Sequence, residues 1–340
     1  MSEALRVCLA RLVAGERPSE AETAAALACV MDGAAGDAEL GGWLTALAVA
    51  GETVDDVVVG AQTLRTRMVP APFEGPLLDV CGTGGDGAHT LNVSTAVSLI
   101  LAAGGVRVAK HGNRAMSSKT GAADVLAALG VRLDADAAAQ KRAMDEAGVA
   151  FLFAQVHHPA IRHAAGVRKA LGFRTLFNML GPLANPAGAQ RQRLGVNHAR
   201  VMPLVAAAAQ RLGSEKVWVV HGAGGIDEIA PAGPTQVVEA TPEGLRVFEV
   251  TPADAGLKEW PLEALRGGEA AENAQALKAL LEGAPGAYRD CVLLNAAAAF
   301  VVADRTSSLK EGAAMAAAAI DSGAAAQTLQ RLVRATGGAP

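Results

Sequence analysis

The chain has 340 residues, of which 51% are hydrophobic, so it can bury a sizeable core and is expected to form two domains. A formal net charge of −4 and an aromatic content of 3% argue against a protein that binds nucleic acid or an anionic membrane surface. Its four cysteines are far apart and form no Cys-x-x-Cys pair, which argues against a zinc site or a disulfide scaffold. The N-terminus lacks a signal-peptide pattern and no apolar run reaches about 18 residues, so we expect a cytoplasmic globular protein.

The first part of the chain, residues 1–70, is predicted to be entirely helical. Ser19 and Glu22 form a capping-box pattern ahead of an alanine-rich run. Thr53 precedes a further helix with acidic residues in its first turn. Pro70-Ala-Pro72 then interrupts the helical pattern and marks a boundary.

From residue 77 onward, the pattern changes to strand–turn–helix alternation, which is typical of an α/β fold with a central, mainly parallel sheet. We expect strands at 77–80, 106–109, 151–154 and 217–220, and further β-structure within 235–251. We expect helices at 93–103, 122–129, 137–147, 202–212, 272–282, 289–303 and 309–335. The loops after the strands at 77–80, 106–109 and 217–220 are expected to converge, because ligands bind at the carboxyl ends of strands in open α/β sheets.

The glycine-rich turn after the first strand is the strongest candidate for a binding loop. Four glycines lie between residues 82 and 87, and they allow backbone N–H groups to approach an anion at the start of the next helix. The turn matches G-x-G-x-x-G, but no acidic residue occurs between Asp86 and Asp124 to bind a ribose, which excludes a dinucleotide site. Ala88 stands where a nucleotide P-loop needs a lysine, so the P-loop pattern is not met either. A glycine turn without a ligand is the plainer alternative, and the small polar side chains that follow it argue for a ligand.

Two long segments, 87–123 and 147–214, contain no acidic residue although the chain is acidic overall. Their positive residues are Arg107, Lys110, Arg114, Lys119, Arg162, Arg168, Lys169, Arg174, Arg191, Arg193, Arg200 and Arg211. This concentration predicts a positive basin for an anionic small molecule, whereas scattered solvated arginines are the alternative. The pair Asp227-Glu228 after a glycine turn suggests Mg²⁺, which takes one or two carboxylates together with substrate phosphates. On its own, an adjacent Asp-Glu pair usually lies in a solvated loop and binds no metal.

Taken together, the motifs resemble the anthranilate phosphoribosyltransferase family. They are Asp79-Val-Cys-Gly-Thr-Gly-Gly-Asp86, Asn92-Val-Ser-Thr95, Lys110-His-Gly-Asn-Arg114, Thr175-Leu-Phe-Asn-Met-Leu-Gly-Pro-Leu-Ala-Asn-Pro186 and His221-Gly-x-x-Gly-x-Asp-Glu228. The resemblance covers nearly the whole chain and implies a fold like those of nucleoside phosphorylases and phosphoribosyltransferases. A small all-α domain of residues 1–70, with an inserted helical stretch at about 165–185, would pack on a larger α/β domain of residues 73–164 and 186–340. The resemblance also implies a homodimer through the helical domain.

The resemblance implies transfer of the phosphoribosyl group of 5-phosphoribosyl 1-pyrophosphate to the amine of anthranilate. The products would be N-(5-phosphoribosyl)anthranilate and pyrophosphate, in the second step of tryptophan biosynthesis from chorismate. The implied phosphoribosyl pyrophosphate site consists of Gly82, Gly85, Asp86, Thr90, Asn92, Val93, Ser94, Thr95, Lys110, His111, Gly112, Asn113, Arg114, Ala115, Met116, Ser117, Ser118 and Ala122. The implied anthranilate site consists of Gly82, Asn113 and Arg168, and the implied Mg²⁺ site of Ser94, Asp227 and Glu228.

One residue departs from the family pattern. The family commonly has a serine where Ala122 stands, so a hydroxyl contact to the donor is either missing or supplied by Thr120.

The chemistry agrees with this interpretation, because an aromatic amine needs no strong base and no catalytic triad is expected. We expect His111, His158 and His221 to be structural or orienting residues rather than general bases. The nearest rival is a pyrimidine nucleoside phosphorylase, which would not share the Lys110-to-Arg114 motif or the Asp227-Glu228 pair. A non-catalytic relative that binds nucleic acid is a rival from another class, and it would need a basic surface.

Overall fold

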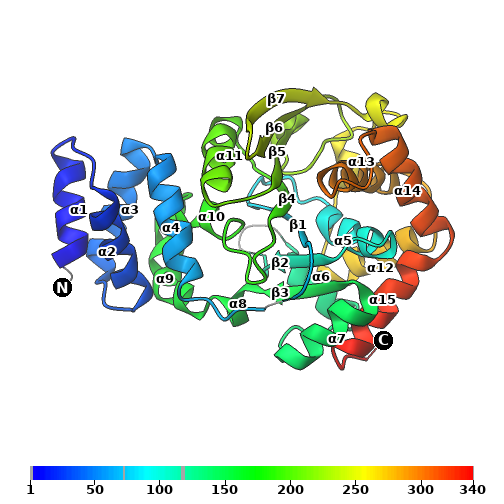
Figure 1. The fold of residues 1–340 in the computed structure, drawn as a ribbon, viewed down its shortest axis with the longest axis horizontal. Helices are drawn as coiled ribbons and strands as arrows, with labels where there is room; N and C mark the ends of the chain where they lie inside the picture. The colour runs from blue at the N-terminus through cyan, green and yellow to red at the C-terminus, as the bar shows by residue number, and fades with distance from the viewer. Residues whose placement is uncertain (1–2, 72, 116–118, 340) are drawn as a thin grey trace.

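A computed structural model of the protein describes residues 3–71, 73–115 and 119–339. Its first part consists of helices α1 (Glu3–Val13), α2 (Glu20–Met31), α3 (Asp37–Ala50) and α4 (Val54–Arg65), which lie at one end of the molecule (Figure 1). The capping box predicted at Ser19 is present, and Thr53, which was predicted only to precede a helix, forms one as well; in each, the cap N–H donates to the carboxylate three residues later. The helical character of this part of the chain is therefore confirmed.

Two later helices join these four. Helices α9 (Arg162–Leu171) and α10 (Phe177–Leu180) follow α8 (Ala154–His157), and they pack against α2, α3 and α4. Trp43 of α3 and Leu180 of α10 are both buried in the same apolar core. The chain thus returns to the helical bundle after it has built three strands of the sheet.

Seven strands form one sheet in the order β3-β2-β1-β4-β5-β6-β7. They are β1 (Leu78–Gly82), β2 (Val108–Gly112), β3 (Val149–Phe153), β4 (Arg191–Gly195), β5 (Lys216–Gly222), β6 (Thr235–Thr241) and β7 (Gly244–Val250). Neighbours among β1 to β5 pair in parallel, and β6 and β7 are antiparallel. The predicted α/β fold with a mainly parallel sheet is confirmed.

Helices cover both faces of this sheet. One face, whose core includes Val80 and Val220, carries α5 (Val93–Ala103), α6 (Ala122–Ala128), α7 (Ala137–Ala147), α12 (Ala270–Leu281), α13 (Ala287–Val302), α14 (Leu309–Asp321) and α15 (Ala324–Ala335). The other face carries α11 (Met202–Arg211), which also packs on α4. The sheet therefore shares a core with the helical bundle on this second side.

Three details of the predicted elements were wrong. Strand β4 was not predicted, because Arg191-Gln-Arg-Leu-Gly195 has a single large apolar residue and is held by pairing with β1 and β5 on both sides. The single helix expected at 309–335 is two helices, since Gly323 adopts a left-handed φ of 75°. Strand β2 continues to Gly112, so Lys110 and His111 lie within a strand that pairs with β3 and not in a loop.

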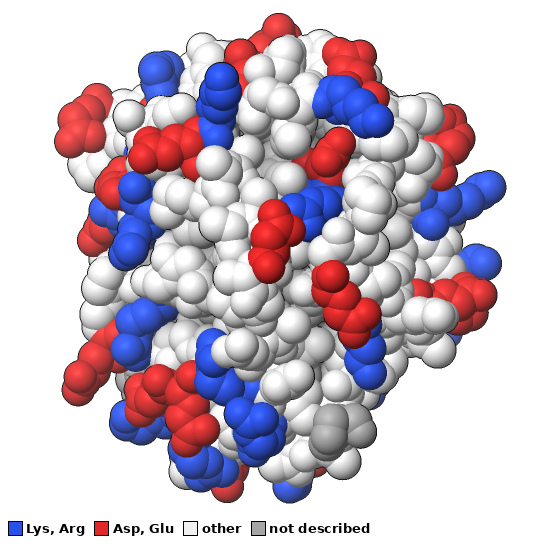
Figure 2. Space-filling model, turned by 90° about the vertical axis from the view of Figure 1, so that its right-hand side faces the viewer, with Lys and Arg blue, Asp and Glu red and all other residues white. Residues whose placement is uncertain are grey.

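The face farthest from the bundle mixes charges of both signs. Figure 2 shows Lys and Arg side chains interspersed with Asp and Glu over the helices of this side, with uncharged surface between them. Within the described residues, no helix is both long and apolar enough to span a bilayer.

Candidate active site

Three neighbouring parallel strands, β1, β4 and β5, end in glycine at the same edge of the sheet. The segment 227–228 packs directly on these three ends. A Cβ atom on Gly195 would lie 1.6 Å from the Asp227 carbonyl oxygen, and one on Gly82 would lie 2.3 Å from Asp227 Oδ2. A Cβ atom on Gly222 would lie 2.4 Å from the Glu228 carbonyl oxygen. Only glycine at these positions leaves room for the acidic segment.

The glycine loop after β1 meets this acidic segment, as the sequence predicted. Gly84 and Gly85 have φ angles of 65° and 71°, in the left-handed region that glycine adopts without strain. The Gly84 N–H donates to Asp227 Oδ2 over 2.7 Å. The Asp227 N–H in turn donates to Asp86 Oδ2 over 3.4 Å. A carboxyl oxygen of Asp227 thus occupies one N–H group of the loop.

Helix α5 starts beside this loop without a side-chain cap. The side chain of its N-cap residue, Asn92, is engaged elsewhere, because its Oδ1 accepts from Asn273 Nδ2 over 3.0 Å. The Asn92 carbonyl oxygen accepts from the Tyr288 hydroxyl over 3.1 Å. Uncapped N–H groups in the first turn of a helix form an anion site, and the helix dipole adds to it. Glycine loop and helix start therefore offer backbone donors to the same region.

Lys110 places a positive charge beneath this helix start. Its side chain is buried, and Nζ donates to the Val80 carbonyl oxygen over 2.7 Å and to Ser94 Oγ over 3.2 Å. Burial lowers the pKa of Lys110, while nearby Asp79 opposes this shift. Lys110 thus connects strand β2 to the first turn of α5.

The two acidic residues of the predicted metal site face different partners. Burial, followed by repulsion from Asp86 and Glu228, raises the pKa of Asp227 to about 7. Glu228 Oε2 lies 2.5 Å from Nη2 of Arg193, whose side chain is fully buried. Burial raises the pKa of Glu228, and the Arg193 charge opposes this. Asp227 is therefore directed to the glycine loop, and Glu228 to the interior of the sheet.

Magnesium fits this set of donors only together with a substrate. No group of three or more His, Cys, Asp and Glu side chains is placed to hold a metal ion among residues 3–71, 73–115 and 119–339. The donors near the glycine loop are the carboxylates of Asp86 and Asp227 and the hydroxyl of Ser94, which are hard oxygen ligands. The repulsion that raises the pKa of Asp227 is the kind that a bound cation relieves.

Arg168 on α9 is a cation without a counter-charge. Its guanidinium lies 5.4 Å from the centre of the Phe177 ring, and burial lowers its pKa. No acidic side chain within the described ranges forms an ion pair with it. A partly buried, unpaired guanidinium is a ready partner for the carboxylate of a ligand.

The segment after β2 is held by α6. Arg114 Nη1 donates to Asp124 Oδ1 over 2.8 Å, and Asp124 Oδ2 accepts from the backbone N–H groups of Ala115 and Gly121. Asn113 is exposed, and its Oδ1 accepts from the Arg114 N–H. Met116, Ser117 and Ser118, which the resemblance places in the donor site, lie outside the described residues.

Several other residues that were predicted in or near the donor site make contacts within the protein. Val93 buries its side chain in the core, so only its backbone can face a ligand. Ala122 begins α6 next to Gly112. The Thr120 hydroxyl, the possible substitute for a serine at 122, donates to the Gly268 carbonyl oxygen over 2.8 Å. Thr90 forms an isolated bridge with Arg266.

The three histidines near the site contact backbone carbonyl groups or one another. His111 Nδ1 lies 3.1 Å from the Gly181 carbonyl oxygen, and its ring lies 4.9 Å from that of His158. Burial lowers the pKa of His111 well below its usual value and that of His158 to about 4. His221 Nδ1 lies 2.9 Å from the Val196 carbonyl oxygen. At neutral pH, the buried pair is uncharged, and the structural or orienting role of these histidines stays a prediction.

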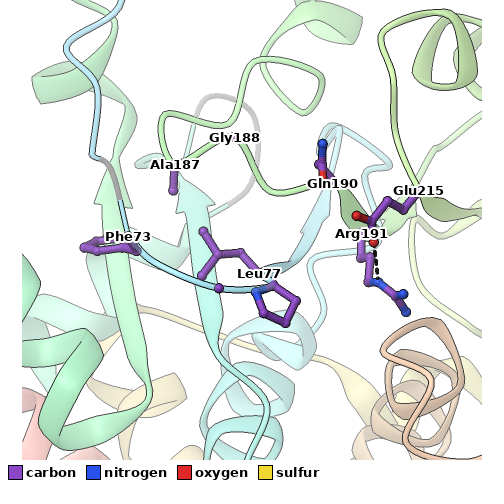
Figure 3. Close-up of a pocket in the computed structure, with 9 residues that line it drawn as sticks. Phe73, Leu77, Ala187, Gly188, Gln190, Arg191 and Glu215 are labelled. Atoms are coloured by element: carbon purple, nitrogen blue, oxygen red, sulfur yellow. Dashed lines mark hydrogen bonds and ion pairs between the residues drawn. The ribbon is translucent and has the colours of Figure 1, made fainter.

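A separate cavity of about 200 Å³ lies at the opposite edge of the sheet, where β1 and β4 begin. Figure 3 shows Phe73 and Leu77 on one side of it and the ion pair between Arg191 and Glu215 on the other. Because this cavity is at the amino ends of the strands, we do not assign the active site to it.

Comparison with known proteins identifies the family. Residues 6–68 match the glycosyl transferase family, helical bundle domain, and residues 74–326 match the glycosyl transferase family, a/b domain. Anthranilate phosphoribosyltransferase of Rhodospirillum rubrum is 52% identical over 330 residues, which cover 97% of this chain and 95% of that protein. The enzyme of Parvibaculum lavamentivorans is 50% identical over 333 residues, which cover 98% of both chains. The chain belongs to the anthranilate phosphoribosyltransferase family.

Solved structures of this family have the same fold. Anthranilate phosphoribosyltransferase from Thermus thermophilus superposes with a TM-score of 0.91 at 44% identity, covering 97% of this chain and 99% of that one. The Saccharomyces cerevisiae enzyme in complex with PRPP and Mg superposes with a TM-score of 0.90 at 28% identity, covering 99% of both chains. The likeness therefore extends over the helical bundle and the α/β part together.

The structure adds three residues to the candidate site that the sequence motifs did not assign to it. Arg174 and Arg193 were recognised only as members of the acid-free segments, and Asn197 was not singled out. Arg174 contacts the glycine loop, as does Asn197, and Arg193 contacts Glu228. No local signal distinguished Arg193, because its strand was not predicted, and none distinguished Asn197.

Proposed function

We propose that this protein transfers the phosphoribosyl group of 5-phosphoribosyl 1-pyrophosphate to the amine of anthranilate and releases pyrophosphate. The observation that carries this proposal is the meeting of the glycine loop, the uncapped start of α5 and Asp227 at one edge of the sheet. Membership of the family supports the same reaction.

The donor is proposed to bind with its pyrophosphate on the glycine loop and the first turn of α5. The N–H groups of Gly85 and Asp86 have no protein acceptor within the described residues, and they lie next to the Gly84 N–H that Asp227 occupies. Such preorganised donors stabilise the negative charge that develops on the leaving group. Lys110 lies beneath the same helix start and adds positive charge there.

The acceptor is proposed to bind with its carboxylate on Arg168. A bidentate bond to the guanidinium would orient the ring and direct the amine toward C1 of the ribose. The nitrogen lone pair then forms the bond to C1 while the C1–oxygen bond breaks and pyrophosphate leaves with the electron pair. The nitrogen finally releases a proton to solvent, so that no strong base is needed.

Magnesium is the proposed cofactor, with Ser94, Asp227 and Glu228 as the candidate residues toward it. When bound with the donor, Mg²⁺ neutralises negative charge on the pyrophosphate. Asp227 contributes from the glycine-loop side. Glu228 would have to share its carboxylate between the metal ion and Arg193. We therefore propose Asp227 as the more direct metal ligand and Glu228 as the less direct one.

We further propose the domain division and the assembly that the sequence predicted. Residues 1–70 with the stretch at about 165–185 would form the helical domain, and residues 73–164 and 186–340 the α/β domain. A homodimer through the helical domain is supported by Val13 and Val49, which are 77% and 84% exposed and line one groove between α1 and α3. A cytoplasmic location fits two charged substrates, and sedimentation equilibrium would test the dimer.

The reaction is tested by the loss of anthranilate fluorescence on addition of phosphoribosyl pyrophosphate and Mg²⁺. A nucleoside with inorganic phosphate serves as the comparison, because a nucleoside phosphorylase would turn over that pair. If fluorescence persists at every Mg²⁺ concentration, the proposed function is wrong.

A further inference from the structure

Arg174 contacts the carbonyl groups of the glycine loop, and the charges of Asp227 and Asp86 oppose the lowering of its pKa by burial. It lies between α9 and α10, in the segment that belongs to the helical bundle by its packing. Its Nη2 donates to the carbonyl oxygens of Thr83, over 3.2 Å, and of Gly84. Its Nη1 donates to Asn197 Oδ1. Both terminal nitrogens of the guanidinium are thus engaged by the loop and by one neighbour.

Asn197 extends this contact to the next carbonyl. Its Nδ2 donates to the Gly85 carbonyl oxygen over 3.0 Å, while its Oδ1 accepts from Arg174. The two side chains are therefore linked to each other, and together they bind three successive carbonyl groups of the loop, those of residues 83, 84 and 85.

Fixing these carbonyls also fixes the N–H groups of the same peptides. In a trans peptide, the carbonyl oxygen and the N–H of the next residue point in opposite directions. The N–H groups of Gly84, Gly85 and Asp86 must then point away from Arg174 and Asn197. The Gly84 N–H does so, since it donates to Asp227 Oδ2 on the other side. The Asp227 carboxyl group thus lies on the side that these N–H groups face.

We infer that Arg174 is a positioning residue, which together with Asn197 holds the glycine loop so that the N–H groups of Gly85 and Asp86 face the pyrophosphate of the donor, while the Gly84 N–H holds Asp227. This inference rests on the proposed function. It also means that the helical bundle, which carries Arg168, contributes a residue to the donor side of the site. Without Arg174, the left-handed glycines leave the loop free to turn its peptides over, and the N–H groups lose their common direction.

The test is the affinity of the purified protein for phosphoribosyl pyrophosphate with Mg²⁺, measured by calorimetry without anthranilate. We expect Arg174→Ala to weaken this affinity by about tenfold or more, because a preorganised set of donors is lost. The KM for anthranilate should remain within about twofold, since Arg168 is unchanged. Amide hydrogen exchange of the peptide that contains residues 82–91 should become faster, and millimolar guanidinium should restore part of the affinity.

Arg65→Ala is the matched control. Arg65 is also partly buried and donates to two backbone carbonyl oxygens, those of Leu183 and Leu212, away from the glycine loop. Its removal should lower the melting temperature without changing the affinity for the donor. Asn197→Ala combined with Arg174→Ala should cost less than the sum of the single effects, because the two side chains act on one loop.

Three outcomes would overturn the inference. These are an unchanged donor affinity in Arg174→Ala, an equal loss of affinity in Arg65→Ala, or strict additivity of the two loop variants. Activity of the unaltered protein is measured first, so a failure of the proposed function is recognised separately.

Discussion

Gly195 offers the most direct way to displace the acidic segment by a single methyl group. The residue ends β4, where it pairs with Gly82 of β1 and Val220 of β5. In Gly195→Ala, the new Cβ would lie 1.6 Å from the Asp227 carbonyl oxygen, which is backbone and cannot rotate away. Because carbon and oxygen atoms need about 3.5 Å, the segment would have to retreat by roughly 2 Å.

This retreat would remove Asp227 from the glycine loop. A misplacement of about 1 Å at a reacting centre can cost about 100-fold in rate, so we expect kcat/KM to fall by about 100-fold or more. Overpacking costs about 1–3 kcal/mol, which is less than the usual stability of a domain, so the variant should remain folded. The rate is measured from anthranilate fluorescence over a range of Mg²⁺ concentrations, and folding by calorimetry.

Gly166→Ala provides the control for this substitution. Gly166 is exposed within α9, and a Cβ atom on it would have no neighbour within 4 Å. The helix should gain up to about 1 kcal/mol, and the rate should not change. If Gly195→Ala keeps kcat/KM within about threefold of the unaltered protein, the close packing of Asp227 on the strand ends is not important for the reaction.

Three further predictions follow from the electrostatics. Arg168→Ala should raise the KM for anthranilate by about 10-fold or more at unchanged KM for the donor, and an unchanged anthranilate KM would exclude Arg168 from the acceptor site. Mn²⁺ binding in the presence of phosphoribosyl pyrophosphate, measured by electron paramagnetic resonance, should strengthen as pH rises through about 7, because burial and neighbouring carboxylates raise the pKa of Asp227 to that value. Asp227→Asn should remove this pH dependence, and its persistence would contradict the assignment of Asp227 to the metal site. Burial lowers the pKa of His158 to about 4, so the unfolded state binds the proton more tightly, and the free energy of unfolding should fall as pH decreases from about 6.5 to about 4. Urea titrations should show His158→Gln losing roughly 3 kcal/mol of this pH dependence, and an unaltered slope would refute the role of His158.

Local patterns in the sequence were sufficient to predict most of the helices and strands. The helices expected at 93–103 and 137–147 have those bounds in the structure, the capping box expected at Ser19 is present, and the helix expected after Thr53 begins there. Each of these features depends on residues within one or two turns of chain, where apolar spacing and cap chemistry act directly. The glycine loop was recognised in the same way, since its φ angles depend on its own residues.

Strand β4 shows where local patterns fail. Arg193 is fully buried in it, although an arginine in a five-residue segment argues against a buried strand. Its place is possible because Glu228, which follows β5, provides the counter-charge 2.5 Å away. That partner is distant in sequence, and only the parallel order of the strands brings the two side chains together.

The sequence by itself determined the α/β class, the helical first part, the loop for an anion and the resemblance to one family, because short-range periodicity and contiguous motifs carry this information. Only the tertiary structure decided toward which partner each side chain of the site points. It turned Asp227 to the glycine loop and Glu228 to Arg193, and it brought Arg174 from the helical bundle onto the carbonyls of the loop. Direction depends on pairing between segments far apart in the chain, and a linear pattern contains no record of that pairing.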